Sequence, residues 1–190
     1  MDTDCPGQPA PTQHFFTAAL EEECSSALTE HADTLRLAFR ACRDRYPFAL
    51  TAGVILPDHL HCILALPAGD TARAARWRLI QTLFERVVGG PGLWRSFDDQ
   101  PLHDEAELQR RVDYIHADPV RHGLVRSPRK WPFSSLHAYV RHGLRPLYWS
   151  GDVDSRYGAS VGSASAGKVG SETTFVRDHT RLPIQGGSRL

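Results

Sequence analysis

The sequence is poor in cysteine and has no long apolar run. Its four cysteines are Cys5, Cys24, Cys42 and Cys62, and no two of them have C-x-x-C spacing. This excludes a zinc ribbon and argues against a disulfide framework, so reduced thiols are the simpler account. No apolar stretch approaches the roughly 18 residues that a membrane-spanning helix needs. We therefore expect no association with a membrane.

The chain also has no net charge of either sign. Lys and Arg number 22 and Asp and Glu number 22, so the formal net charge is +0 and a globally polycationic nucleic-acid binder is excluded. A hydrophobic content of 41% and 190 residues suffice for one domain with a real core. The first twelve residues have neither the basic nor the apolar region of a signal peptide. We expect a cytoplasmic protein.

The hydrophobic pattern predicts strands alternating with helices between residues 14 and 152. Residues 1–13 are expected to form a mobile arm, and the Gly- and Ser-rich residues 153–190 a disordered tail. The predicted strands are residues 14–20, 48–56, 59–66 and 93–103, and the predicted helices are residues 25–45, 71–88 and 104–118. The first six elements match a β-α-β-β-α-β ferredoxin-like plan, which predicts an α+β fold with one open sheet face. The last helix would pack against that open face.

Two of the helices carry specific predictions. In the helix at residues 71–88, Ala75, Leu79, Leu83 and Val87 are expected to form the buried stripe, with Arg73, Arg76, Arg78 and Arg86 on the outer surface. The last helix is expected to end just before Pro119, because a residue that precedes proline is disfavoured in the helical region.

The run VILPDHLHCILAL (residues 54–66) places two histidines one residue apart in a predicted strand. Side chains two residues apart share a face of a strand, so His59 and His61 project together while Leu60, Cys62 and Leu64 point into the core. Paired imidazoles form half of a site for a divalent metal. A pair of this kind on a strand is more often two partly exposed, hydrogen-bonded histidines with no metal, and that is the alternative here.

Tyr114 and Asp118 supply the second half of a possible site. They are four residues apart in a predicted helix and so share one face. The carboxylate could be a third ligand beside two imidazoles, and this mixed nitrogen and oxygen set suits Mn²⁺ well and Mg²⁺ less well. The alternative is a packed core tyrosine and a carboxylate at a helix end.

Two segments together resemble the REP-associated tyrosine transposases, the single-tyrosine branch of the HUH nucleases. VILPDHLHCILALPAGD is similar to the family's double-histidine motif, and DYIHADPVRHGLVRSPRKWPFSSLHAYV to its Y-I-H-x-N-P-V block and the W-P-W-S-S run that follows. The likeness covers residues 14–152 in order and without large gaps. It implies a ferredoxin-like nuclease domain that acts on single-stranded or hairpin DNA, associated with the nucleoid.

The resemblance also assigns roles to residues. It implies that His59 and His61 bind a divalent metal, Mg²⁺ or Mn²⁺, and that Tyr114 is the nucleophile of a strand transfer through a 5′-phosphotyrosine link. Asp118 stands where the family usually has Asn or Gln as a third ligand. Phe133 replaces a frequent Trp, and Gln81 a common Lys. The family branch implies a monomer, with a dimer left open.

Clusters of basic side chains, together with one aromatic ring, are the expected DNA contacts. The residues predicted to bind DNA are Arg73, Arg76, Arg78, Arg121, Arg126, Arg129, Lys130 and Trp131. For Trp131 and Phe133, packing of the last helix is an equal alternative to base stacking.

Two other functions remain open: a hairpin-binding regulator that does not cleave, and a phosphohydrolase of small nucleotides that uses only His59 and His61. A histidine-triad hydrolase is excluded, because Ile63 stands where a third histidine is needed.

Overall fold

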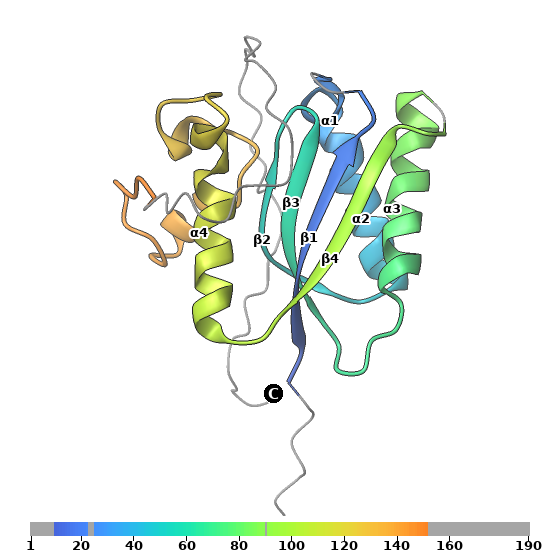
Figure 1. The fold of residues 1–190 in the computed structure, drawn as a ribbon, viewed down its shortest axis with the longest axis horizontal. Coiled ribbons are helices and arrows are strands. Elements are labelled where there is room, and N and C mark those ends of the chain that lie inside the picture. The colour runs from blue at the N-terminus through green and yellow to red at the C-terminus, as the bar shows by residue number, and fades with distance from the viewer. Residues whose placement is uncertain (1–9, 23–24, 90, 152–190) are drawn as a thin grey trace, which may run out of the picture.

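A computed structural model describes residues 10–22, 25–89 and 91–151 of the chain, so residues 1–9 of the predicted arm and the predicted tail lie outside it. Four strands, β1 (Thr12–Leu20), β2 (Ala49–Ile55), β3 (His59–Leu66) and β4 (Trp94–Leu102), form one sheet in the order β2-β3-β1-β4. Every neighbouring pair is antiparallel. This is the strand order of the ferredoxin-like plan, and the predicted fold class is confirmed (Figure 1).

Strand β1 lies at the centre of the sheet and is apolar on both faces. It pairs with β3 from Thr12↔Leu66 to Ala19↔His59, and with β4 on its other side. The strand begins at Thr12, so it includes the last two residues of the predicted arm. Its register fixes the position of the two histidines of β3, because Thr17 lies directly opposite His61.

Three helices precede β4: α1 (Ala27–Glu30), α2 (Ala32–Arg45) and α3 (Arg73–Val88). Helices α2 and α3 cover one face of the sheet (Figure 1). The single helix predicted for residues 25–45 is interrupted at His31, which ends α1 and precedes α2. Among the described residues, no helix is long and apolar enough to cross a membrane.

The predicted buried stripe of α3 is wrong for Ala75 and Val87, which are exposed, while Leu79 and Leu83 are partly buried and pack against the core. The helix buries Arg76, Trp77, Ile80 and Phe84, whereas Val87 is 64% exposed. Trp77 stacks on Phe97 of β4 with ring centroids 4.9 Å apart, and such large rings bury more area than the small side chains of the predicted stripe. The packing of the aromatic side chains therefore set the rotation of the helix.

Arg76 was predicted on the outer surface of α3, and this is also wrong. Its side chain is 2% exposed and donates to both carboxylate oxygens of Asp70, at 3.2 and 2.8 Å. It also donates to the carbonyl oxygens of Tyr46 and Pro47. A guanidinium bound in this way is a structural link between α3 and the preceding loop, and its buried donors are not available to DNA.

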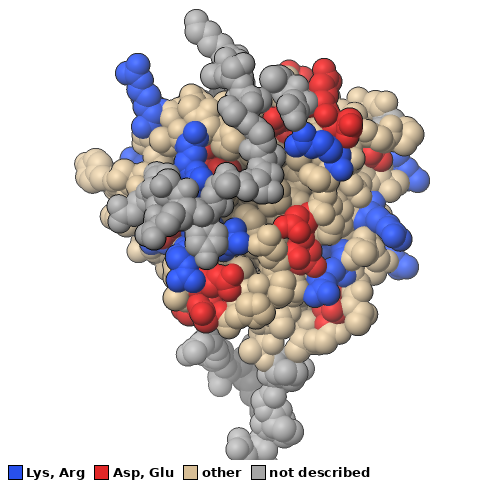
Figure 2. All heavy atoms as spheres, in the orientation of Figure 1, with Lys and Arg blue, Asp and Glu red and all other residues tan. Residues whose placement is uncertain are grey.

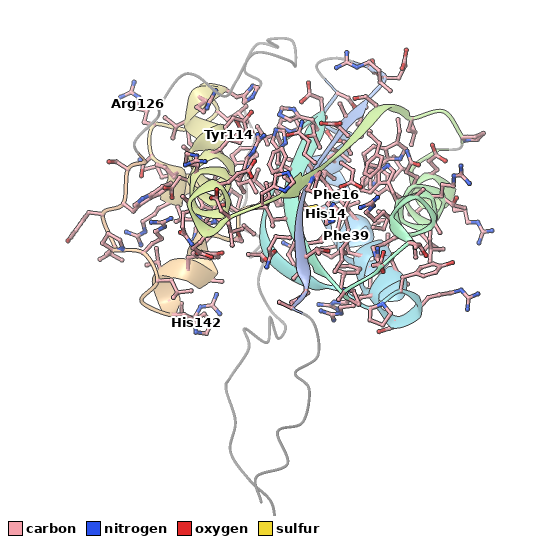
Figure 3. The ribbon with its side chains drawn as sticks, turned by 60° about the horizontal axis from the view of Figure 1, so that its bottom comes forward. His14, Phe16, Phe39, Tyr114, Arg126 and His142 are labelled. Atoms are coloured by element: carbon pink, nitrogen blue, oxygen red, sulfur yellow. The ribbon has the colours of Figure 1, made fainter. Side chains whose placement is uncertain are left out.

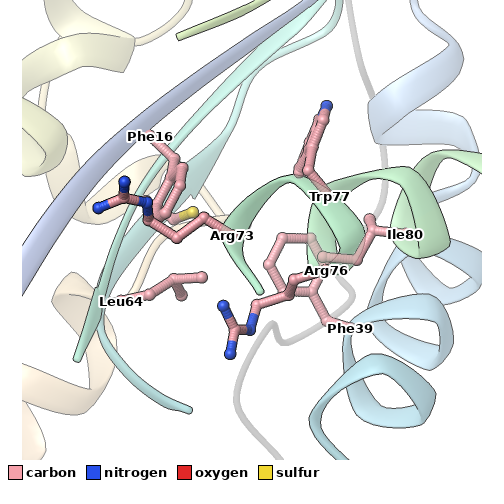
Figure 4. A pocket seen from close by; sticks show the side chains of 8 residues that line it. Phe16, Phe39, Leu64, Arg73, Arg76, Trp77 and Ile80 are labelled. Carbon is pink, nitrogen blue, oxygen red and sulfur yellow. The ribbon is translucent and has the colours of Figure 1, made fainter. Parts of the chain in front are cut away.

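A small cavity lies beside Arg76, between α2, α3 and the sheet (Figure 4). Phe16, Phe39, Trp77 and Ile80 line it, and its volume is about 10 Å³. That is room for about one water molecule. The cavity is a packing gap on the face of the sheet opposite the two histidines, and it is too small for a substrate.

Helix α4 (Glu105–Arg121) lies against the other face of the sheet (Figure 1). Asp104 caps its first turn by accepting from the backbone N–H of Glu107. The prediction that the helix ends before Pro119 is wrong. The last turn stays helical because the N–H of His122 donates to the carbonyl of Asp118, and Pro119 is itself buried.

The chain then covers the outer edge of β2. A short 3₁₀ helix, η1 (Pro128–Lys130), leads to backbone hydrogen bonds from Ile55 to Phe133 and from Ser135 to Gly53, and α5 (Leu136–Arg141) follows. Trp131 is 4% exposed, and its indole N–H donates to the carbonyl of Ile55. Its ring is therefore not available for base stacking, and the packing alternative is the correct one.

Candidate active site

Two histidines of β3 face α4 rather than the core under α2 and α3. Leu60, Cys62 and Leu64 point the other way and are buried, as predicted. The Nδ1 atom of His59 lies 2.7 Å from Asp58 Oδ1, and Nδ1 of His61 lies 2.9 Å from Thr17 Oγ1. With a proton on each Nδ1, these contacts orient both rings and leave both Nε2 lone pairs free to bind a metal.

Asp118 of α4 meets both free nitrogens. Its Oδ2 atom lies 3.4 Å from His61 Nε2 and 3.8 Å from His59 Nε2. The side chain is fully buried, yet neither carboxylate oxygen has a hydrogen-bond donor among the described residues, and neither does His59 Nε2 have a partner. Buried polar atoms without partners are rare and point to a missing ion or water.

The spacing of these atoms fits a divalent cation. Ligands bonded to one ion at about 2.1 Å lie roughly 3.0–3.4 Å apart in octahedral or tetrahedral arrangements. The separations of 3.4 and 3.8 Å lie at or just beyond that range and are long for hydrogen bonds. Two imidazoles and a carboxylate are a donor set for Mn²⁺ or Mg²⁺, and His59, His61 and Asp118 would hold the ion.

Protonation at this site is divided unequally. Burial lowers the pKa of His61 to about 4, so this imidazole is neutral at pH 7 and able to bind a metal. Burial alone would also lower the pKa of His59, but Asp118 and Asp58 outweigh it and raise that pKa to about 9. In the metal-free protein His59 is therefore protonated at pH 7, and it must release its Nε2 proton when a metal binds. Asp118 keeps a lowered pKa despite its burial, because three histidines surround it. The carboxylate is therefore ionised.

Tyr114 lies on the same face of α4, one turn before Asp118. Its ring meets His61 edge-on with centroids 5.3 Å apart and Phe15 at 6.1 Å. The side chain is half-buried between α4 and the sheet. Phe16 and Phe39 lie on the other side of the sheet (Figure 3). The four side chains that the sequence predicted to share a site therefore lie together in the structure: His59, His61, Tyr114 and Asp118.

Positive charge adjoins the tyrosine. The Arg121 guanidinium lies 4.5 Å from the centroid of the Tyr114 ring, and its Nε atom is 4.0 Å from Asp118 Oδ1. Burial and the charge of Asp118 raise the pKa of the Tyr114 phenol, while Arg121 and Arg111 oppose this. The phenol is therefore protonated before any reaction, and it has a cation beside it to stabilise the phenolate.

The other predicted DNA contacts form two groups. Arg126, Arg129 and Lys130 are exposed just after α4, whereas Arg73 and Arg78 lie on α3 across the sheet. Arg126 extends away from the body of the protein in Figure 3. On the face shown in Figure 2, cations and carboxylates are intermixed, in keeping with the zero net charge. Arg73 is itself paired with Asp99, with Nε 3.1 Å from Oδ2.

Sequence reasoning missed His122 as part of the site. Its Nε2 atom lies 3.6 Å from Asp118 Oδ1, and its ring centroid is 4.8 Å from that of His59. The signal was present, because residues 118 and 122 have the i, i+4 spacing of one helix face. Because the helix was predicted to end before Pro119, residue 122 was not placed on the same helix face as Asp118.

Comparison with known proteins identifies the family of this chain. No family model matches the chain. A REP-associated tyrosine transposase of Escherichia coli is 40% identical over 141 residues, which cover 73% of this chain and 85% of that protein. The chain belongs to the REP-associated tyrosine transposase family. A second relative, from Haemophilus influenzae, is 33% identical over 156 residues, covering 74% of this chain and 89% of the relative.

A solved structure of a REP-associated tyrosine transposase bound to a REP hairpin has the same fold. It superposes with a TM-score of 0.73 at 32% identity, over 90% of this chain and all of that one. Membership of the transposase family makes this chain one of a group of DNA-processing proteins. The family resemblance inferred from the histidine and tyrosine motifs is confirmed.

Proposed function

We propose that this transposase-family protein cleaves and rejoins single-stranded DNA at a hairpin through a covalent tyrosine link that depends on a divalent metal. The observation that carries the proposal is the position of Asp118. A fully buried carboxylate with two unpartnered oxygens faces the free nitrogens of His59 and His61, and the Tyr114 ring lies against His61. Buried carboxylate oxygens are nearly always hydrogen-bonded, so these two unpaired oxygens support a site for a cation.

In the proposed reaction Tyr114 is the nucleophile. Its phenol oxygen forms a bond to the scissile phosphorus, and the bond from phosphorus to the 3′ oxygen breaks. The phenol loses one proton and the departing 3′ oxygen gains one, so the step is balanced. The product is a 5′-phosphotyrosyl link with a free 3′-hydroxyl. Because the link keeps the energy of the phosphodiester, a 3′-hydroxyl can attack it and rejoin strands without ATP.

The remaining residues hold and polarise the phosphate. A divalent cation, Mg²⁺ or Mn²⁺, when bound by His59, His61 and Asp118, would polarise the scissile phosphate and offset the charge on its oxygens. Arg121, which already lies over the Tyr114 ring, is placed to contact a phosphate oxygen beside the nucleophile. The Nδ1 contacts with Asp58 and Thr17 keep the imidazoles oriented.

The exposed cations after α4 are the proposed DNA contacts nearest the site. Arg126, Arg129 and Lys130 follow directly from the helix that carries Tyr114. Arg73 and Arg78 could reach only a part of the substrate that extends across to the α3 side of the sheet. The relative bound to a REP hairpin makes such a hairpin the first substrate to test. Contacts to phosphates would make the affinity sensitive to salt.

The test is a covalent trapping assay. The full chain is incubated with Mn²⁺ or Mg²⁺ and a hairpin oligonucleotide with a single-stranded flank, labelled on the 3′ side of the cleavage point, and is then denatured. We expect a labelled protein–DNA adduct that Tyr114→Phe abolishes, because phenylalanine has no oxygen to attack phosphorus. Tyr148→Phe is the matched control, because Tyr148 is 87% exposed and lies after α5.

An adduct that survives Tyr114→Phe would disprove the assigned nucleophile. Hairpin binding without any adduct, in either metal, would favour the non-cleaving regulator. Turnover of a small nucleotide ester that persists in Tyr114→Phe would favour the phosphohydrolase. The protein is expected to act as a monomer, which light scattering with and without the hairpin would check.

A further inference from the structure

His122 is the residue at this site for which the proposed reaction has no role. It is the residue that ends α4, and its backbone N–H donates to the carbonyl of Asp118. Its imidazole lies beside the same carboxylate as the β3 histidines, with Nε2 3.6 Å from Asp118 Oδ1. Ligand atoms of His59, Asp118 and His122 all lie within 4.8 Å of one another.

We propose that His122 is a further protein ligand of the divalent cation, beside His59, His61 and Asp118. This inference rests on the proposed function, because it concerns the same ion. It changes the donor set from two imidazoles and a carboxylate to three imidazoles and a carboxylate. Imidazole nitrogen suits transition metals better than Mg²⁺, so the site would select Mn²⁺ or Co²⁺ over Mg²⁺.

The two oxygens of Asp118 support this assignment. Oδ2 faces His59 and His61, and Oδ1 faces His122, yet both oxygens are buried and without donors among the described residues. The i, i+4 spacing brings His122 Nε2 to within 3.6 Å of Oδ1, so this imidazole faces the oxygen that His59 and His61 do not. Neighbouring ligands of one ion lie about 3.0–3.4 Å apart, and the 3.6 Å between His122 Nε2 and Asp118 Oδ1 is close to that separation.

The side chain is also suitably placed to be a ligand. It is 24% exposed, so it reaches the cluster from the solvent side, whereas His59 and His61 reach it from the sheet. Its ring centroid is 4.8 Å from that of His59, at a tilt of 59°. The rings are therefore not stacked on each other, and the contact has the form of two imidazoles that converge on one carboxylate.

The test measures metal binding by the metal-free full chain. Co²⁺ is titrated into the wild type, His122→Ala, His59→Ala and His142→Ala while the visible absorption of the metal is recorded, and Mg²⁺ affinity is measured by competition. We expect His122→Ala to weaken Co²⁺ binding about tenfold or more and to change the absorption spectrum, while Mg²⁺ affinity falls less. His142→Ala is the matched control, because His142 is exposed and ends α5 as His122 ends α4.

Each outcome separates this inference from the proposed function. If His59→Ala abolishes Co²⁺ binding but His122→Ala keeps the wild-type affinity and spectrum, His122 is not a ligand and the proposed function stands. If the wild type binds no Co²⁺, both fail. His122→Gln guards against an effect of lost volume: a loss like that of His122→Ala supports imidazole ligation, whereas full wild-type affinity overturns it. Thermal unfolding in EDTA confirms that each variant is folded.

Discussion

Each face of the sheet buries a charged side chain, but only one of the two side chains has hydrogen-bond partners among the described residues. Under α2 and α3, Arg76 is 2% exposed and donates to both oxygens of Asp70 and to two backbone carbonyls. Against α4, Asp118 is fully buried and has no hydrogen-bond donor for either oxygen among the described residues. The same strand, β3, contributes Cys62 to the first face and His61 to the second.

The difference shows how to distinguish a structural charge from a functional one. Removing a charge from water costs several kcal/mol, and only close partners recover that cost. Arg76 has its partners within the protein, so the protein needs nothing else there. Asp118 is surrounded by imidazole nitrogens at 3.4–3.8 Å, which are long for hydrogen bonds. A buried carboxylate with opposite charge around it but no hydrogen bond to either oxygen indicates a site for a ligand from outside the chain.

The largest expected effect concerns the satisfied charge. Arg76→Ala would remove both guanidinium donors from the Asp70 carboxylate, which keeps only the backbone N–H of Ala72, and the donor of two carbonyls. It would also open a cavity beside Trp77 and Ile80. We expect the free energy of unfolding to fall by about 3–5 kcal/mol, as when one partner of a buried pair is removed. Urea denaturation of the metal-free protein measures it.

The control for this prediction is Arg78→Ala on the same helix. Arg78 is exposed, so its loss should change the free energy of unfolding by no more than about 0.5 kcal/mol. An equal decrease in the free energy of unfolding in the two variants would show that the buried contacts of Arg76 do not stabilise the protein. The comparison between the two faces would then fail. A change in hairpin affinity in folded Arg76→Ala would restore its predicted role in DNA binding.

A smaller effect is expected from the unsatisfied charge. If Asp118 holds a cation, Mn²⁺ at about one hundred times its Kd should stabilise the wild type by about 2.7 kcal/mol, because it binds only the folded state. Asp118→Ala should remove most of that metal-dependent gain. The measurement is the Tm in Mn²⁺ against the Tm in EDTA.

Asp98→Ala on β4 is the control, since this carboxylate is exposed and lies outside the histidine cluster. An Asp118→Ala protein with an undiminished response to Mn²⁺ would mean that the ion binds elsewhere. Asp118→Asn should keep part of the response, because an amide oxygen still binds hard cations.

The sequence predicted the sheet and the main site well because both depend on strong local signals. Alternation along β3 placed His59 and His61 on one face and Cys62 on the other, and the register with β1 did not alter this. The spacing of Tyr114 and Asp118 placed both on one side of α4. These are statements about one element at a time, and periodicity determines them.

The errors concern how elements pack together. The stripe of α3 was predicted from its aliphatic residues alone, whereas contacts of Trp77 and Phe84 with β4 rotated the helix and buried Arg76. The helix end before Pro119 followed a local rule that tertiary burial overrode, and this concealed His122. Neither outcome can be read from periodicity, because each depends on residues distant in the sequence.

The smallest expected effect is the pH dependence of the satisfied pair. The hydrogen bonds from Arg76 hold the pKa of Asp70 below its usual range, against the opposing effect of burial. A carboxyl whose folded pKa is depressed stabilises the protein above its unfolded pKa, about 3.9, and this stability is lost as the pH falls toward the folded pKa. Asp70→Asn should therefore have a flatter decline in the free energy of unfolding below about pH 5.

Urea denaturation in EDTA between pH 3 and pH 6 measures this slope, with Asp98→Asn as the control for an exposed carboxylate. In the wild type the unfolded chain binds the proton first, so acid favours unfolding, and the Asn variant lacks that proton site in both states. A decline with the same slope in wild type and Asp70→Asn would show that Arg76 does not favour the ionised carboxylate. The pair would then stabilise the α3 side by packing alone, and the contrast with the unpartnered Asp118 would lose its electrostatic basis.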